Sequence, residues 1–216
     1  MLVEFIGAAG AGKTFLSERV RGTLKDEGLA AQNFDLIQIH KAAPRNLFLA
    51  TRAVYLSVMT RPITLFRAKR AFAVIASYSI RRELCEQAGG IQITCEGLFH
   101  KIISLYRNSR GLEMDQLADM LFRRIKPPDV VIVVEVSAQT AFARRSARNR
   151  PNDHFTRKSV RADVEIITEM IEVMARIKQS LHPPMRVVRV NAEEEGGEVA
   201  VADIVAALKS AERSHG

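Results

Sequence analysis

The feature that most constrains this chain is the run Gly7-Ala8-Ala9-Gly10-Ala11-Gly12-Lys13-Thr14, which matches G-x-x-x-x-G-K-[ST] at every fixed position. An apolar run at residues 2–6 precedes it. Apolar residues then recur every four positions, as is typical of a helix, at Leu16, Val20 and Leu24. Strand, glycine loop and helix therefore follow in the order that lets backbone N–H groups surround a phosphate. A simple glycine-rich turn is the alternative, but pattern and context together favour nucleotide binding.

Lys13 and Thr14 carry the specific chemistry of this loop. We expect Lys13 to reach the β/γ-phosphates of ATP and to take part in catalysis, and Thr14 to hold the Mg²⁺ ion. Glycines let the backbone approach a phosphate with no side chain in the way. The predicted nucleotide-binding residues of this segment are Gly7, Ala8, Ala9, Gly10, Ala11, Gly12, Lys13, Thr14 and Phe15.

Strand-like segments alternate with helical segments along the whole chain. The segment at residues 130–134 is apolar throughout, as in the middle of a parallel sheet. This order predicts an α/β fold of three layers around a parallel sheet, with ligands at the carboxyl ends of the strands. At 216 residues, we expect one domain spanning residues 1–216. The predicted strands lie at residues 2–6, 30–39, 91–95, 130–134 and 185–190.

The net charge of +8 is unevenly distributed. Residues 36–82 contain nine Lys and Arg and no Asp or Glu, and residues 144–161 contain seven basic residues against Asp153 alone. Clusters of one sign indicate anionic partners, whether phosphates, nucleic acid or anionic lipid. We interpret residues 36–88 as a basic helical insertion that binds an anionic acceptor. Its apolar spans are too short to cross a membrane, but a helix lying on a membrane surface stays open.

Two further features bear on location and assembly. Cys85 and Cys95 have no metal-ligand spacing and are interpreted as buried thiols in a reducing cytoplasm. Because the first strand begins at Leu2, we expect no signal peptide and a cytoplasmic location. The helix predicted at residues 156–180 has one apolar face, which favours core packing and leaves a homodimer seam as the alternative.

Three carboxylates flank the predicted strands. Glu96 follows the strand at residues 91–95, where it could bind Mg²⁺ or accept the proton of an attacking hydroxyl. Asp35, near the end of the weaker strand at residues 30–39, is the alternative base. Asp129 precedes its strand and would lie at the opposite edge of the sheet, so we interpret it as a cap or turn residue.

Arginines after the strand at residues 130–134 predict a lid over the phosphates. Phosphoryl transfer develops charge on the equatorial oxygens, and arginine meets phosphate in a bidentate manner. Arg144 and Arg148 lie one helical turn apart and share a face. A solvated basic helix end is the alternative interpretation. The candidate lid residues are Arg144, Arg148 and Arg150, with Arg145 behind them.

These motifs resemble the nucleoside and nucleotide kinase group of P-loop proteins, thymidylate-kinase-like members in particular. The resemblance rests on the glycine loop, on Cys95-Glu96-Gly97, on residues 128–136 with the arginine-bearing segment that follows, and on residues 186–192. It implies a roughly five-stranded parallel core. It also implies an arginine-rich lid at residues 144–156 and a loop at Asn191 and Ala192 that touches adenine. No Asp-Arg-Tyr-type motif follows residues 91–95.

Two functions fit the sequence. The first is an ATP-dependent kinase that moves the γ-phosphoryl to an anionic small molecule, such as a nucleoside monophosphate or a phosphorylated metabolite. The second is an NTP-hydrolysing protein whose basic segment binds nucleic acid or an anionic membrane. The absence of a nucleic-acid-binding module and the presence of the lid arginines favour the kinase.

Overall fold

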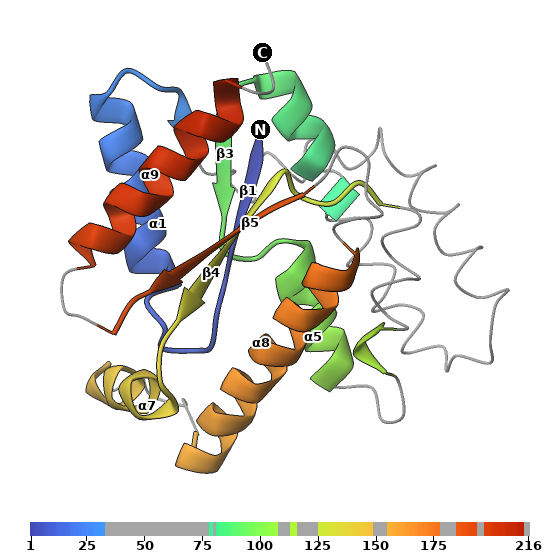
Figure 1. The fold of residues 1–216 in the computed structure, drawn as a ribbon, viewed down its shortest axis with the longest axis vertical. Helices are drawn as coiled ribbons and strands as arrows, with labels where there is room; N and C mark the ends of the chain where they lie inside the picture. Colours follow the sequence, from blue (N-terminus) through green and yellow to red (C-terminus); the bar gives the residue numbers. More distant parts are fainter. Residues whose placement is uncertain are drawn as a thin grey trace, which may run out of the picture.

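The computed structural model describes residues 1–32, 78–79, 81–107, 113–115, 125–148, 155–177, 185–193 and 197–213. Helical residues 81–88 precede β3. The labelled elements, shown in Figure 1, are β1 (Leu2–Ile6), α1 (Lys13–Asp26), β2 (Ala31–Gln32), β3 (Ile91–Thr94), α5 (Leu98–Arg107), β4 (Val130–Glu135), α7 (Ala138–Ala147), α8 (Arg157–Ile177), β5 (Arg186–Asn191) and α9 (Glu198–Arg213).

The sheet has five strands in the order β2-β3-β1-β4-β5, and every neighbouring pair is parallel. The predicted α/β fold with a parallel five-stranded sheet is therefore confirmed. β1 lies between β3 and β4, so the glycine loop leaves from the middle of the carboxyl edge. The strand predicted at residues 30–39 is described only at Ala31–Gln32, and its later residues, Asp35 among them, lie outside the described part.

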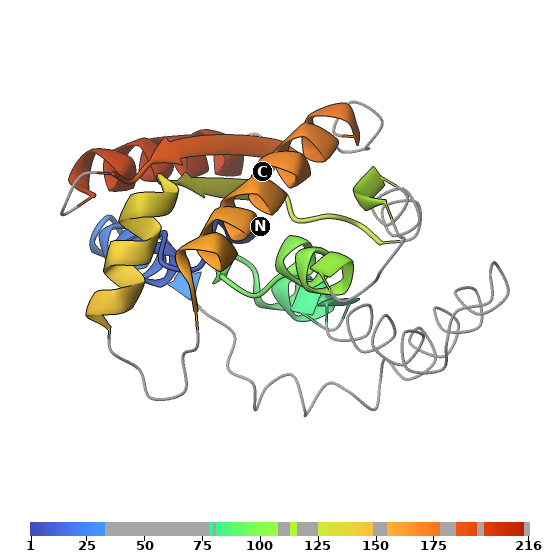
Figure 2. The ribbon, with the colours of Figure 1, turned by 90° about the horizontal axis from the view of Figure 1, so that it is seen from below.

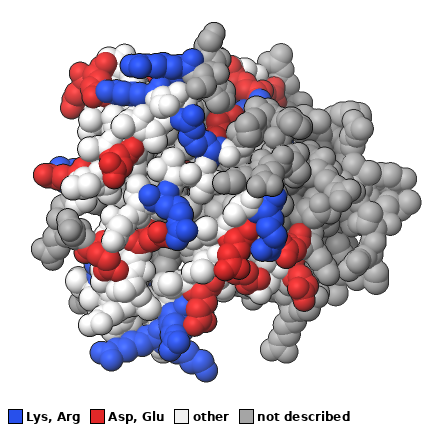
Figure 3. Space-filling view, in the orientation of Figure 1, with Lys and Arg blue, Asp and Glu red and all other residues white. Residues whose placement is uncertain are grey.

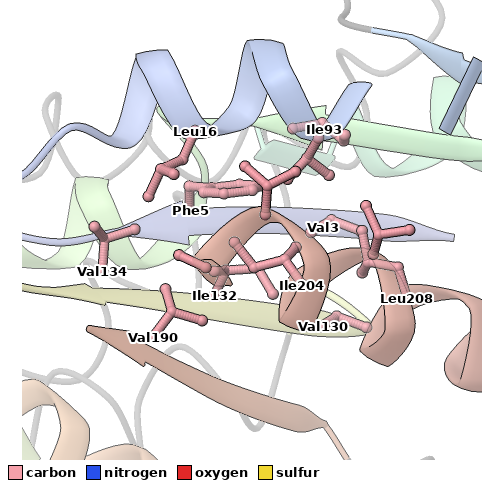
Figure 4. Close-up of a cluster of buried hydrophobic side chains, with 14 of the residues drawn as sticks. Val3, Phe5, Leu16, Ile93, Val130, Ile132, Val134, Val190, Ile204 and Leu208 are labelled. Atoms are coloured by element: carbon pink, nitrogen blue, oxygen red, sulfur yellow. The ribbon is translucent and has the colours of Figure 1, made fainter. Parts of the chain in front are cut away.

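One face of the sheet is covered by α1 and α9 (Figure 1). Alternate residues of β1, Val3 and Phe5, point to this side and are fully buried. They pack with Ile132 of β4 against Leu16 of α1 and Ile204 of α9 (Figure 4). The four-residue spacing of apolar positions in α1 is thus explained by one helix face lying on the sheet.

The opposite face is covered by α5 and α8, as the two views in Figures 1 and 2 show. Leu2 and Ile6 of β1 point to this side and pack in one cluster with Ile102 of α5 and Met170 and Met174 of α8. The apolar face of α8 is therefore used for packing within the chain, as predicted. The homodimer stays a prediction.

Asp129 lies at the amino edge of the sheet, as its place before β4 predicted. Its carboxylate holds this edge together. Its carboxylate accepts the backbone N–H of Leu2 at 2.7 Å and two hydrogen bonds from Arg82, each of 2.8 Å. Burial by itself raises the pKa of Asp129, but the Arg82 guanidinium and the Leu2 N–H outweigh it and hold that pKa below its usual value. Arg82, one of the nine cations of residues 36–82, thus has a structural role at the edge opposite the glycine loop.

The structure also bears on the predicted helical insertion, on membrane crossing and on the two cysteines. Of the basic helical insertion predicted at residues 36–88, residues 78–79 and 81–88 are described and helical, and most of the rest lies outside the described residues. No helix in the described ranges combines the length and apolarity that a membrane crossing requires. Both cysteines are free thiols, with Cys85 buried and Cys95 half-buried.

Candidate functional site

The glycine loop is a tight turn between β1 and α1. Gly10 has a φ of 94°, and a Cβ at this position would overlap the backbone carbonyl of Ala141 in α7. A Cβ at Gly7 would lie 2.6 Å from the carbonyl oxygen of Val134 in β4. Only glycine allows such approaches, so the loop is packed against the carboxyl end of β4 and against α7.

Lys13 lies at the mouth of this loop. Its Nζ donates to the backbone oxygens of Gly7 at 2.8 Å and of Ala8 at 3.0 Å. Thr14 follows as an exposed residue in the first turn of α1. The N-cap residue Gly12 offers no side-chain hydrogen bond, and the first turn of α1 has no acidic residue. The backbone N–H groups of this turn are therefore positioned to bind an anion, as the sequence motif predicts.

Arg144 reaches across the loop from α7. A Cβ on Gly12 would lie 3.9 Å from its Nη1, and its Nη2 donates to the backbone oxygen of Glu193 at 3.2 Å. Ser137 caps the helix by accepting the N–H of Thr140 at 3.1 Å. The structure thus brings the predicted lid residue Arg144 to the predicted phosphate loop.

The other lid arginines lie differently. Arg145 stacks over the ring of Phe155 at 4.4 Å, and Arg157 lies over Phe142 at 5.4 Å. The two rings themselves meet edge to face with centroids 5.5 Å apart, which joins the end of α7 to the segment before α8. Arg148 is the exposed C-cap residue of α7, four residues after Arg144. The third candidate, Arg150, lies outside the described residues.

The loop after β5 is joined to α7 through Glu193. Its carboxylate accepts hydrogen bonds from the backbone N–H of Ser137 and from the Thr140 hydroxyl, the latter at 2.5 Å. These hydrogen bonds, first the one from Thr140, hold the pKa of Glu193 below its usual value. Asn191 Oδ1 accepts the N–H of Glu193 at 3.0 Å, and Ala192 is buried. Sequence reasoning named the last two residues but missed Glu193, which no motif marks.

A pocket of about 320 Å³ opens at the carboxyl ends of β4 and β5, next to the glycine loop. Ala8 forms part of its wall, and Asn191 and Glu193 supply polar groups. Its apolar lining comes largely from α8, through Val164 and Ile167 among others. The two residues expected to lie near adenine therefore differ in position. Asn191 lines this pocket beside the glycine loop, whereas Ala192 lies in the core.

Glu96 lies at the same carboxyl edge, beyond the end of β3, and is exposed. Its backbone N–H donates to Thr94 Oγ1 at 3.2 Å, and Arg81 Nη1 donates to the same hydroxyl at 2.5 Å. Burial lowers the pKa of Arg81, while the charges of Glu96 and Glu4 act in the opposite direction. Sequence reasoning predicted the position of Glu96 but assigned no role to Glu4.

Cys95, the residue before Glu96, contacts α1. Its Sγ donates to Ser17 Oγ in α1 at 3.3 Å. Burial raises the pKa of the Cys95 thiol, and both Lys13 and Glu96 are close enough to influence it. The charge of Lys13 lowers the pKa of this thiol and the charge of Glu96 raises it.

Charge on the described surface is mixed in the view of Figure 3, where Lys and Arg alternate with Asp and Glu over most of the face. Several basic side chains project at its lower end, where Figure 1 places α7 and the start of α8. The basic residues at these helix ends are Arg144, Arg145, Arg157 and Lys158. Most of the one-signed segment 36–82 lies outside the described residues.

Comparison with known proteins places the fold. No family model matches this chain, and no curated protein matches it significantly in sequence. Among solved structures, it is similar to deoxyadenosine kinase from M. mycoides with the products dCMP and dCDP bound, at 16% identity, with 97% of this chain and 100% of that chain covered and a TM-score of 0.54. The same kinase with bound dATP is similar at 17% identity, with 97% and 99% covered and a TM-score of 0.51.

The chain therefore has an α/β fold similar to that of a nucleoside kinase, built around a glycine loop of the phosphate-binding pattern. Deoxyadenosine kinase is one of the solved proteins whose fold is similar to that of this chain. The narrower resemblance to thymidylate kinases stays a prediction, because these structures represent a different member of the group.

Proposed function

We propose that this protein is an ATP-dependent phosphotransferase that moves the γ-phosphoryl group of ATP to a nucleoside or nucleotide. The observation that carries the proposal is the position of Arg144. Its guanidinium lies beside Gly12 of the glycine loop and donates to the backbone oxygen of Glu193. A cation at this position suits phosphoryl transfer, because negative charge on the γ-phosphoryl oxygens needs fixed donors.

In the proposed reaction, an acceptor oxygen attacks the γ-phosphorus of ATP in line with the bond to the β–γ bridging oxygen. The new O–P bond forms as that bridging bond breaks, and ADP leaves. Lys13 and the N–H groups of the first turn of α1 hold the phosphates, while Arg144 donates to the transferred group. Glu96 accepts the proton of an acceptor hydroxyl, and Asp35 is the alternative base.

Thr14 and Glu96 are the proposed residues for Mg²⁺. No group of three or more His, Cys, Asp and Glu side chains with metal-site geometry occurs in the described part of the chain. This suits Mg²⁺ with nucleotide, since that ion takes one or two protein oxygens and fills its remaining positions with phosphate oxygens and water. When bound, it would neutralise phosphate charge. The exposed Thr14 hydroxyl and Glu96 carboxylate fit that donor set.

The acceptor class follows from the fold and from the charges near Glu96. The similar solved structures are of a kinase named for a deoxynucleoside, which supports a nucleoside or nucleoside monophosphate as acceptor. Arg81 supplies a cation beside Glu96, whereas Arg82 is committed to Asp129 at the other edge. We therefore propose that residues 36–88, with Arg81 among them, bind the acceptor.

The test is ADP release in the presence of ATP, Mg²⁺ and a panel of nucleosides, nucleoside monophosphates and phosphorylated metabolites. We expect one acceptor to stimulate release, and Lys13→Ala to abolish it while the fold survives. Unchanged turnover in that variant would contradict the role given to the loop. Tight, steeply salt-dependent binding to nucleic acid or anionic vesicles, with no stimulating metabolite, would favour the NTP-hydrolysing alternative.

A further inference from the structure

Glu4 is a carboxylic acid in the middle of the core. It lies in β1 between Leu2 and Ile6, on the face covered by α5 and α8, and its side chain has 0% exposure. Burying a carboxylate costs several kcal/mol unless partners compensate for lost water. An apolar residue here would continue the pattern of the strand, so the presence of Glu4 requires an explanation beyond packing.

The partners of Glu4 belong to the first turn of α5. Its Oε1 accepts the backbone N–H of His100 at 2.9 Å, and the N–H groups of Leu98 and Phe99 also face the carboxylate. α5 has no acidic residue in its own first turn. Glu4 therefore supplies, from a neighbouring strand, the negative charge that a helix N-terminus favours.

The second oxygen of Glu4 is not satisfied in this way. Oε2 is buried and has no hydrogen-bond partner among the residues that the structure describes. It lies directly beneath Gly97, where an added Cβ would overlap it. The turn between β3 and α5 thus rests on the Glu4 carboxylate, and glycine at position 97 makes that approach possible.

Thr94 and Arg81 link the Glu4 carboxylate to Glu96 of the candidate site. Glu4 is in register with Thr94 of β3, whose hydroxyl accepts from Arg81 and from the backbone N–H of Glu96. Arg81 also interacts electrostatically with both Glu4 and Glu96. The buried carboxylate, Arg81 and the turn that carries Glu96 therefore form one connected unit.

We propose that Glu4 is a positioning residue for phosphoryl transfer, which holds the turn at residues 95–97 and the Arg81 side chain so that Glu96 faces the acceptor beside the glycine loop. This inference rests on the proposed function. Glu4 itself touches neither nucleotide nor acceptor, since it is buried beneath Gly97. It acts through the first turn of α5 and through Arg81.

The electrostatics of Glu4 give this role a measurable signature. Burial raises the pKa of Glu4 to about 7, although the N–H groups of α5 and the charge of Arg81 act against the shift. The other titratable groups that interact with it are the Tyr78 hydroxyl and the Cys95 thiol. Ionisation of Glu4 near neutral pH therefore changes the charge beneath the turn that carries Glu96.

The experiment compares the parent, Glu4→Gln and the control Gln92→Leu. Gln92 is a matched control because it is buried in β3, pairs in register with Leu2, and also has an unpartnered side-chain oxygen. For each protein, kcat and the KM values for ATP and acceptor are measured from pH 5.5 to 8.5. Backbone amide shifts of residues 96–100 are followed by NMR over the same range, without nucleotide, in versions of all three proteins that also carry His100→Gln, because a histidine side chain changes charge in this pH range.

We expect the amide shifts of residues 96–100 to titrate near pH 7 in the parent and in Gln92→Leu but not in Glu4→Gln. We expect kcat of Glu4→Gln to fall by about 10²-fold, the effect of a small misplacement of a catalytic group. Its KM for ATP should change less than about threefold, and its rate profile should lose the inflection near pH 7.

Two results would overturn the inference. One is a Glu4→Gln variant with parental kcat and rate profile, even if it is less stable. The other is the absence of a titration at residues 96–100 in the parent. If the parent transfers phosphate to no acceptor, the proposed function fails, and the NMR comparison still decides whether Glu4 holds the turn.

Discussion

The stability of this protein should depend on pH through Glu4. Its pKa is raised from 4.5 to about 7 in the folded chain, so the folded state retains a proton that the unfolded state releases. This contribution is fully present below pH 4.5 and is lost as pH rises through 7. One pKa unit corresponds to about 1.4 kcal/mol, so the full effect is about 3 kcal/mol.

Between pH 5.5 and 8.5, roughly 2 kcal/mol of that amount should disappear from the free energy of unfolding. The assay is urea unfolding of the parent and Glu4→Gln across this range at constant ionic strength. Because glutamine does not titrate, the stability of the variant relative to the parent should rise by about 2 kcal/mol from the acid to the alkaline end. Gln92→Leu should keep the parental pH dependence. Parallel curves for the parent and Glu4→Gln would refute the assignment of a raised pKa to this carboxyl.

Three further predictions concern single side chains. Arg82→Ala removes the ion-pair partner of the buried Asp129 carboxylate and should lower the free energy of unfolding by about 3–5 kcal/mol in urea, whereas Arg161→Ala, which breaks an exposed pair, should cost less than about 1 kcal/mol. Arg144→Ala should lower kcat by about 10²–10³-fold in single-turnover assays, and a change in ATP affinity alone would argue against a role in transfer. Glu96→Gln should lower kcat by roughly 10²–10⁴-fold while ATP binding by calorimetry persists, and if turnover stays near parental the role of base passes to Asp35 or to no residue.

The parts of the structure that follow from local sequence could be predicted. The glycine loop is one, because close backbone approach permits only glycine at Gly7 and Gly10. The sheet and its carboxyl edge are another, since strands that alternate with helices favour a parallel sheet. Lys13 and Glu96 then lie at the same edge, because each comes after the carboxyl end of a strand.

The parts that depend on distant pairing could not be predicted. The bond from His100 to Glu4 joins residues 96 positions apart, and the Arg82–Asp129 pair joins residues 47 apart. Neither partner has a spacing or motif that marks it. The sequence analysis grouped Arg82 with the cations expected to bind the acceptor. Only the structure shows that Arg82 pairs with Asp129 at the amino edge, whereas Arg81 lies near Glu96 at the carboxyl edge. Glu193 was missed for the same reason, since its partners lie in α7.

The buried Arg82–Asp129 pair has a consequence for how this protein can diverge. It ties the segment before β3 to the starts of β1 and β4, so strong polar fastening lies at the amino edge. Exposed groups at the other edge, such as Glu96 and Arg148, carry little of the folding free energy. Mutations can therefore accumulate at the edge that carries the proposed site with small losses of stability, while the opposite edge preserves the fold.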